Sequence, residues 1–196
     1  MADSTEYEPL VEYELKFRIA PERDLDALLA RCRFVRSEAQ SDEYFQHPCR
    51  DFAQTDEALR IRTIGDGRWV TYKGARFRRD VKARREIEFP LVEQTAAAFR
   101  ATLLALGFRS VAVVSKQRHV YLLGDEEETE IVVDDVEGLG RFIEIEVVAP
   151  SSQADAASDR LVTLARSWGL EHPERRSYLE LVLEASGDET PSDERG

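Results

Sequence analysis

Charged residues recur at alternate positions in several segments of the sequence. In VEYELKFRI, residues 11–19, Glu12, Glu14, Lys16 and Arg18 alternate with apolar or aromatic residues. A period of two is typical of a β-strand with one buried face, so these four side chains are expected to share the opposite face. The other charged side chains expected to share strand faces in this way are Arg60 and Arg62, Lys73, Arg84 with Glu86 and Glu88, Lys116 with Arg118, and Glu144 with Glu146.

These charged faces allow two interpretations. Any single pair is explained by an amphipathic strand whose polar face meets water. The whole set favours a second arrangement, because the interleaved residues, such as Phe17, Ile61 and Ile87, are large enough to pack against helices outside a sheet. If such a sheet closes, the charged faces line its interior, where a small ligand can bind.

A charged interior requires a charged ligand, because buried ions are costly unless they are paired. Arginine and lysine suit phosphate oxygens, and carboxylates at i and i+2 suit hard divalent cations such as Mg²⁺. Acids and bases on one wall therefore predict a complex of metal and polyphosphate. The glycine segments GDG and GLG are too short for a P-loop and lack its Lys-Ser/Thr pair.

The elements that would position these residues alternate between strands and helices. Helices are expected over residues 21–34, 93–107 and 152–169, while residues 175–185 fit either a strand or a helix. The segments expected to form strands, including a hairpin with GDG as its turn, are residues 11–19, 42–47, 58–74, 82–89, 110–123, 129–138 and 140–150. The order indicates an α+β protein with about eight mainly antiparallel strands. We expect one domain over residues 1–185 and a disordered acidic tail over residues 186–196.

The composition excludes several classes of protein. The formal net charge of −12 argues against general binding to nucleic acid or to anionic membranes, although a local basic site for a small anion remains compatible with it. No apolar run approaches the roughly 20 residues that span a bilayer. Cys32 and Cys49 have no metal-ligand spacing and His47, His119 and His172 are scattered. We therefore expect a cytoplasmic protein with reduced thiols, as a monomer or homodimer.

The segment EYELK, residues 12–16, resembles the ExExK signature of the CYTH superfamily, the triphosphate tunnel metalloenzymes. The later elements of this family follow in order as LRIR, YKG, REIE, SKQR, VVDDVEGLGRFIEIE and RRSYLELV. The match extends over about residues 11–183, and EGLGRFIEIE with the terminal RSY is most similar to the class IV adenylyl cyclase branch.

The resemblance implies a closed eight-stranded antiparallel β-barrel, a triphosphate tunnel with helices packed outside, and two divalent cations, Mg²⁺ or Mn²⁺. The metal ligands that it implies are Glu12, Glu14, Asp134, Glu144 and Glu146. The triphosphate contacts that it implies are Lys16, Arg18, Arg60, Arg62, Lys73, Arg84, Lys116 and Arg118, of which Lys16, Arg60 and Arg118 are the candidate catalytic residues. Glu86 and Glu88 match a further acidic pair, Asp134 is preferred to Asp135 by its match to the family position, and Arg84 is preferred to Arg85 by its parity with Glu86.

The same tunnel fits more than one function. The C-terminal motifs favour an adenylyl cyclase that converts ATP to cyclic AMP and pyrophosphate. The alternatives are a triphosphatase acting on tripolyphosphate, thiamine triphosphate or a nucleoside triphosphate, and a non-catalytic module that binds polyphosphate or nucleotide. The aromatic residues that could stack on a base, or simply belong to the core, are Phe45, Trp69, Tyr72 and Tyr178. If the resemblance fails, the remaining interpretation is an α+β domain with solvated charged faces.

Overall fold

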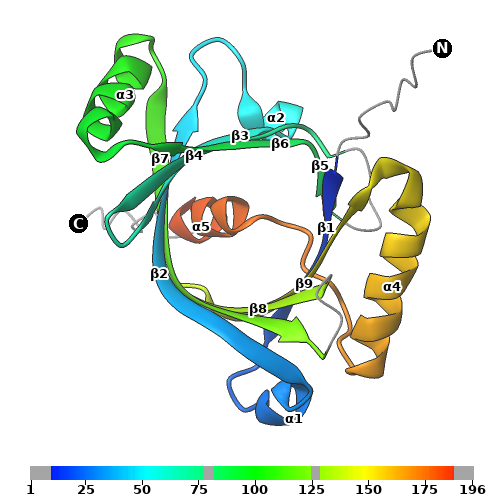
Figure 1. Cartoon of the computed structure of the whole chain (residues 1–196). Helices are drawn as coiled ribbons and strands as arrows, with labels where there is room; N and C mark the ends of the chain where they lie inside the picture. The colour runs from blue at the N-terminus through cyan, green and yellow to red at the C-terminus, as the bar shows by residue number, and fades with distance from the viewer. Residues whose placement is uncertain (1–9, 77–81, 125–128, 188–196) are drawn as a thin grey trace, which may run out of the picture.

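A single antiparallel sheet forms the body of the molecule. The computed structural model describes residues 10–76, 82–124 and 129–187. Within these residues the strand order is β5-β1-β9-β8-β7-β2-β3-β4-β6, and the sheet curls so that Figure 1 looks along its inside. The strands are β1 (Leu10–Ile19), β2 (Cys32–Gln46), β3 (Ala58–Ile64), β4 (Gly67–Lys73), β5 (Lys82–Arg84), β6 (Glu86–Leu91), β7 (Arg109–Leu123), β8 (Thr129–Val136) and β9 (Gly140–Pro150).

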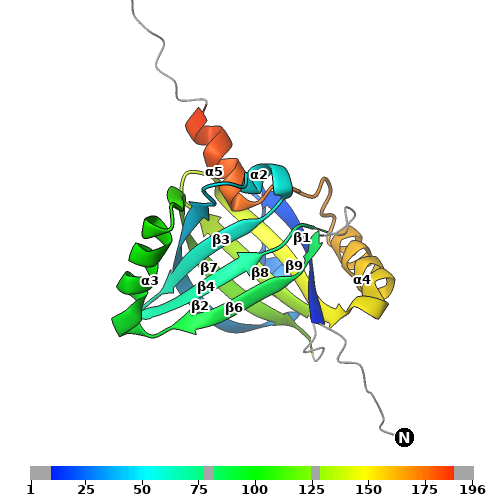
Figure 2. The same ribbon diagram turned by 90° about the horizontal axis from the view of Figure 1, so that it is seen from above.

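The apolar residues of β1 and β9 face outward, against α4 (Ala154–Ser167). Tyr13, Ile145 and Leu161 are fully buried in this cluster, and Figure 2 shows α4 against one side of the sheet. The alternation of VEYELKFRI therefore separates an outer apolar face from an inner charged face, as the pattern predicts.

A second helix covers the opposite part of the curl. In α3 (Glu93–Ala105), Leu103 packs with Ile61 of β3 and Phe45 of β2. The expectation that the interleaved residues pack outward holds less well in β6, where Ile87 and Phe89 are 46% and 43% exposed. The ring of Phe89 contacts that of Phe99 edge-to-face, with centroids 6.3 Å apart and an angle of 87° between the ring planes.

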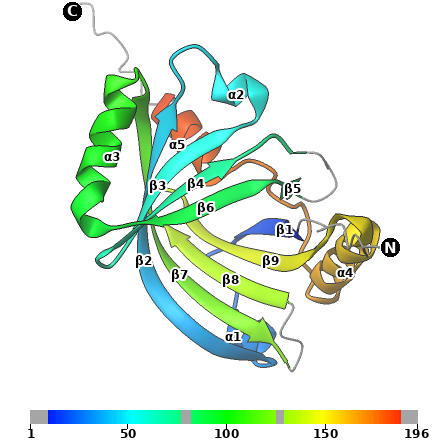
Figure 3. The same cartoon turned by 45° about the horizontal axis from the view of Figure 1, so that its top comes forward.

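The two outermost strands of the sheet are neighbours in the chain. β5 pairs with β1 and β6 pairs with β4, and only Arg85 lies between β5 and β6 (Figure 3). Among the described residues no ladder joins β5 to β6, so the sheet is a curled antiparallel sheet whose hydrogen bonding is not closed. The expected eight strands are nine here, because the segment 82–91 contributes one short strand to each edge.

The N-terminal helix is the largest departure from the expected elements. Instead of a helix over residues 21–34, the chain forms a four-residue α1 (Asp26–Leu29), and β2 starts at Cys32. The strand β2 is long because it pairs with β7 along almost its whole length. A further short helix, α2 (Phe52–Thr55), follows β2, and a 3₁₀ turn (Ser151–Gln153) precedes α4.

Residues 175–185, which fitted either element type, contain the start of helix α5 (Tyr178–Gly187). This helix lies over one end of the curl (Figures 1 and 2). Because α5 extends to Gly187, the predicted tail begins inside a helix, and residues 188–196 lie outside the described part of the chain.

Candidate functional site

The inner face of the sheet surrounds a cavity of about 460 Å³, which lies within the usual range of small-molecule sites. Its walls bring together residues from eight of the nine described strands and from α2 and α5. The predicted site residues that line it are Glu12, Glu14, Lys16, Arg60, Arg62, Lys73, Arg84, Glu86, Glu88, Lys116, Arg118, Glu144 and Glu146. Arg18 and Asp134 are not among the lining residues.

Three carboxylates gather on the wall formed by β1 and β9. Glu14 and Glu146 are direct cross-strand partners, and one carboxylate oxygen from each of Glu12, Glu14 and Glu146 lies within 4.8 Å of the others. Burial and neighbouring acids raise the pKa of Glu12, although Lys73 opposes the shift. The same causes raise the pKa of Glu146 well above its ordinary value, against the influence of Arg118.

This trio fits a divalent cation. Carboxylate oxygens are the ligands that Mg²⁺ and similar hard cations prefer. Three acids this close repel one another, and a bound cation would relieve the repulsion that adds to burial in raising the pKa values of Glu12 and Glu146. Glu144 lines the same wall, directly across from Lys16 on β1, and accepts a 2.6 Å hydrogen bond from Arg118.

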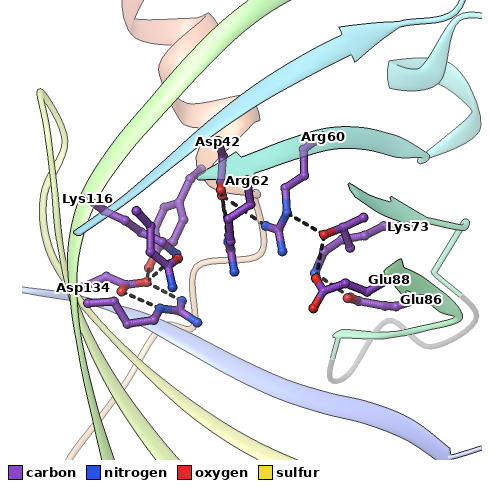
Figure 4. A network of polar contacts seen from close by, with 12 residues as sticks. Asp42, Arg60, Arg62, Lys73, Glu86, Glu88, Lys116 and Asp134 are labelled. Carbon is purple, nitrogen blue, oxygen red and sulfur yellow. Dashed lines mark hydrogen bonds and ion pairs between the residues drawn. The ribbon is translucent and has the colours of Figure 1, made fainter. Parts of the chain in front are cut away.

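A buried carboxylate holds the two arginines of β3. Arg62 donates through Nε and a terminal nitrogen to the two oxygens of Asp42, at 2.7 Å each (Figure 4). Arg60 donates to the same carboxylate at 3.2 Å and to Thr71 at 3.3 Å. Asp42 is only 2% exposed, and despite its burial the charges of Arg60 and Arg62 hold its pKa well below its ordinary value. Asp42 therefore stays ionised and fixes both guanidinium groups toward the cavity.

Asp134 holds a second pair of cations in the same way (Figure 4). Lys116 donates to Oδ2 of Asp134 at 3.0 Å, and Arg118 donates to both of its oxygens. The hydroxyl of Tyr178 on α5 also donates to Oδ2, at 3.0 Å. Asp134 is fully buried whereas Asp135 is exposed, so the structure places Asp134 on the inner side of β8, beneath the cations.

The surroundings of Lys116 disfavour its charged form. Burial, together with repulsion from Arg118 and Arg62, lowers the pKa of Lys116 to about 8, although Asp134 and Glu144 favour the charged form. An anion entering the cavity would restore the charged form.

The two basic residues of the first strand differ in position. Lys16 is 2% exposed, and its ammonium lies 4.0 Å from the centroid of the Tyr178 ring. Arg18 is exposed, donates to the carbonyl of Leu139 and stacks 4.7 Å from the centroid of Phe142. The structure thus brings Lys16 to the cavity and leaves Arg18 beyond it.

The wall formed by β4, β6 and β5 carries mixed charges. Lys73 pairs with Glu86 across the β4–β6 ladder, and Thr71 donates to Glu88 at 2.7 Å. The charge of Lys73 lowers the pKa of Glu86 against the effect of burial. Arg84 of β5 is the cross-strand partner of Glu12 on β1.

Several residues of the site were missed by sequence reasoning. Asp42 and Tyr44 alternate with Glu43 within the strand expected over residues 42–47, so their spacing could have indicated an inner face, but they were not included among the charged strand faces. The residues that α2 and α5 contribute, such as Phe52, Leu179 and Leu183, carry no spacing signal because they come from short or capping segments.

The four aromatic residues that could stack on a base lie in different parts of the structure. Phe45 and Tyr178 line the cavity. Tyr72 donates to Glu57, which itself lines the cavity, and Trp69 packs over Gly67, where its ring would contact an added Cβ. Only Phe45 and Tyr178 of these four are therefore placed to meet a ligand.

The class of this protein is defined by a curled antiparallel sheet that carries acids and paired cations on its concave face. The CYTH domain family matches residues 10–178, and the chain therefore belongs to this family. The chain is 33% identical over 177 residues to a Methanocaldococcus jannaschii protein named as a candidate adenylate cyclase, covering 88% of this chain and 98% of that protein.

Two further relatives agree with this assignment. The adenylate cyclase CyaB of Aeromonas hydrophila is 27% identical over 205 residues, covering 96% of this chain and 99% of that protein. A solved structure from Pyrococcus horikoshii is 40% identical, with a TM-score of 0.80, covering 88% of this chain and 98% of the other. Within the described residues, none of the helices has the length and apolar character needed to cross a membrane.

Proposed function

We propose that this protein is a metal-dependent adenylyl cyclase of the class IV type, which converts ATP to cyclic AMP and pyrophosphate inside the cavity. The observation that carries the proposal is that one cavity combines an acidic trio on β1 and β9 with anchored cations on β3 and β7. The names of two relatives, both adenylate cyclases, support the cyclase over other triphosphate chemistry. The proposal includes closure of the curled sheet into a tunnel around the substrate.

Glu12, Glu14 and Glu146 would hold Mg²⁺ or Mn²⁺, and Glu144, which lines the same cavity, would help to hold a second cation. When bound, the metal would neutralise phosphate charge and favour ionisation of the attacking hydroxyl. We assign Asp134 to the cations rather than to the metal site, because its two oxygens already accept from Lys116, Arg118 and Tyr178.

The residues of this chain would act by binding and by neutralising charge. Lys16, Arg60 and Arg118 would contact the triphosphate, helped by Arg62, Lys73, Arg84 and Lys116. In the reaction the ribose 3′-hydroxyl gives its proton to water and its oxygen bonds to the α-phosphorus, while the bond from that phosphorus to the bridging oxygen breaks and pyrophosphate leaves. Cations fixed in advance by Asp42 and Asp134 would stabilise the charge that develops on the phosphates without reorganising.

An apolar section at one end of the cavity supports a nucleotide rather than plain polyphosphate. Phe45, Phe52, Ala58, Leu179 and Leu183 line the cavity where β2, α2, β3 and α5 meet. Apolar and aromatic walls suit a nucleobase, and they offer nothing to inorganic tripolyphosphate.

A triphosphatase is the second candidate, favoured by a different observation. Both acids of the FIEIE segment, Glu144 and Glu146, line the cavity beside Glu12 and Glu14. The acids and cations would bind a triphosphate without any contact to an organic group, so hydrolysis needs fewer features than cyclisation. The non-catalytic alternative is less favoured, because all but one of the predicted phosphate contacts line the cavity.

Product analysis separates these functions. The protein would be incubated with ATP, tripolyphosphate and thiamine triphosphate, each with Mg²⁺ or Mn²⁺, and the products separated by chromatography. Cyclic AMP with pyrophosphate supports the cyclase, whereas ADP or free phosphate supports the triphosphatase. Binding of ATP without any product, under conditions where the protein is folded, would favour the binding module.

Arg60→Ala should weaken ATP binding at least about tenfold. The control is Arg109→Ala, which replaces an exposed arginine on β7.

A further inference from the structure

Tyr178 contacts the cations of both the first strand and β7. Its ring centroid lies 4.0 Å from the ammonium nitrogen of Lys16 and 4.9 Å from that of Lys116. Its hydroxyl donates to Asp134, the carboxylate that also accepts from Lys116 and Arg118. The ring face of Tyr178 thus contacts two lysines, while its hydroxyl holds the carboxylate of Asp134.

The start of α5 holds this ring in place. Ser177 and Glu180 form a reciprocal capping box, in which the backbone N–H of Ser177 donates to Glu180 at 2.6 Å and the N–H of Glu180 donates to the Ser177 hydroxyl at 3.1 Å. Just before the helix, the N–H of Glu174 donates to the carbonyl of Lys16 at 2.7 Å. The C-terminal segment is therefore tied directly to the strand that carries Lys16.

The chemistry of Tyr178 matches this position. An aromatic face attracts a cation, most strongly where water is excluded, and Tyr178 is only 7% exposed. Burial and the neighbouring carboxylates Glu144 and Asp134 raise the pKa of Tyr178 well above its ordinary value, so its hydroxyl remains a donor. The ring also packs edge-on against Phe142, with centroids 5.1 Å apart, which limits its rotation.

We propose that Tyr178 is a positioning residue, which uses its ring face to hold Lys16 and Lys116 and its hydroxyl to hold Asp134, so that helix α5 sets the placement of the phosphate-binding cations. This inference rests on the proposed binding of a triphosphate in the cavity. It differs from base stacking, the alternative role for this aromatic residue, because its effect falls on the phosphates of the ligand.

A first experiment reads the lysines without any ligand. The ammonium signals of Lys16 and Lys116 would be observed by NMR, with Lys16→Arg and Lys116→Arg used for assignment. The ring of Tyr178 should shift these signals upfield; Tyr178→Phe should keep the shift, and Tyr178→Leu should remove it. Wild-type signals without a ring-current shift would overturn the proposal, whatever the enzymatic activity.

A second experiment measures binding of tripolyphosphate and of ATP by calorimetry in the presence of Mn²⁺. Tyr178→Leu should weaken both ligands by a similar factor, about tenfold, because both depend on the lysines. Tyr178→Phe should weaken both only about threefold, because it loses one hydrogen bond and keeps the ring. Weaker binding of ATP alone would show stacking on the base and contradict the proposal.

The control variant is Leu181→Ala on the same helix. Leu181 is 4% exposed and packs in the same cluster, but it does not line the cavity. This variant should lower thermal stability while leaving the lysine signals and the tripolyphosphate affinity near those of the wild type. If Leu181→Ala reproduces the effects of Tyr178→Leu, Tyr178 has only a structural role.

Discussion

Two buried aspartates, Asp42 and Asp134, serve the same physical purpose on the adjacent strand pairs β2–β3 and β7–β8. Asp42 lies directly across a ladder from Arg62, and Asp134 lies directly across a ladder from Arg118. Each aspartate also accepts a hydrogen bond from a second cation, which lies two residues before that arginine on the arginine's own strand. A single carboxylate under two cations leaves a net positive charge facing the cavity. The cations are therefore oriented before any ligand arrives, which reduces the cost of ordering them on binding.

Replacing Asp42 with asparagine should lower the stability of the ligand-free protein by about 3 kcal/mol, because the substitution leaves two nearly buried arginines without their counter-ion. The midpoint of urea unfolding measures this loss. Asp135→Asn, at an exposed position, is the matched control and should leave the midpoint unchanged. An unchanged midpoint for Asp42→Asn would contradict the anchoring role.

The stability difference between wild type and Asp42→Asn should also depend on pH. Because the pKa of Asp42 is lowered in the folded state, its contribution is fully present well above its ordinary pKa of 3.8 and is lost as the pH falls toward the folded value. Urea titrations between pH 7 and pH 3 should show the difference shrinking only below about pH 4–5. A difference that shrinks near neutral pH would point to another group.

Lys116 should take up a proton when a triphosphate binds at alkaline pH. Its pKa of about 8 leaves the ammonium partly deprotonated at higher pH, and a bound anion favours the charged form. Calorimetry of tripolyphosphate binding in buffers of different ionisation enthalpy measures this uptake. The Lys116→Arg variant, which stays charged, should lack the alkaline component, and identical uptake in both proteins would exclude Lys116 as its source.

At the level of elements, periodicity predicted most strands and two of the longer helices. The segments around α3 and α4, and the strands β1, β3, β4, β7, β8 and β9, lie close to their expected positions. Their apolar residues repeat with one clear period, since each element buries one face. The GDG segment forms the β3–β4 turn, with Gly65 at a φ of +53°, which glycine adopts without strain.

The helix expected over residues 21–34 failed because pairing outweighed local propensity. Leu25, Leu28 and Leu29 have helical spacing, but Cys32 and the residues after it find a long partner in β7. Ladder hydrogen bonds and packing between distant segments decide such cases, and neither can be read from a local window.

The charged residues of the site could be predicted from the sequence, whereas their hydrogen-bond partners could not. Parity along each strand assigned Arg60 and Lys116 to a charged face, but it did not show that Asp42 and Asp134 lie under them. Cross-strand register determines those contacts, and register depends on which strands pair. Closure of the sheet was expected from the family resemblance, and it remains a prediction.

Helix α4 should support the fold without contributing to ligand binding. Leu161→Ala removes a fully buried side chain that packs behind β1 and β9, and it should lower the free energy of unfolding by about 2–5 kcal/mol. The affinity for tripolyphosphate, measured well below the unfolding temperature, should stay within about twofold of the wild type, because Leu161 does not line the cavity. A large loss of affinity would show that the outer layer controls the inner wall.

At the level of the whole molecule, the sheet reconciles an acidic chain with an anionic ligand. The formal net charge is −12, yet seven arginines and lysines line the cavity, namely Lys16, Arg60, Arg62, Lys73, Arg84, Lys116 and Arg118. Among the described residues, these cations share the cavity with nine acids, namely Glu12, Glu14, Asp56, Glu57, Glu86, Glu88, Glu144, Glu146 and Glu180. A complex of metal and triphosphate carries both signs of charge and can satisfy both sets.

Removal of the metal should abolish turnover. Excess EDTA should eliminate product formation from ATP, and Mn²⁺ should restore it, because the acidic trio would otherwise repel the phosphates. Glu146→Gln should weaken Mn²⁺ binding about tenfold or more, as measured by calorimetry. Glu137→Gln, at an exposed position after β8, is the control, and full turnover in EDTA would exclude a metal-dependent reaction.

The pairing of β1 with β9 has a consequence for biosynthesis. Ile19 pairs with Arg141 and Glu14 pairs with Glu146, so the acidic trio joins two segments from opposite ends of the chain. Contacts so distant in sequence form slowly, and a protein emerging from the ribosome produces its N-terminal strands first. A nascent chain that stops before Glu146 carries Glu12 and Glu14 without their partner, so the cation site can assemble only after the segment that carries Glu146 has been synthesised.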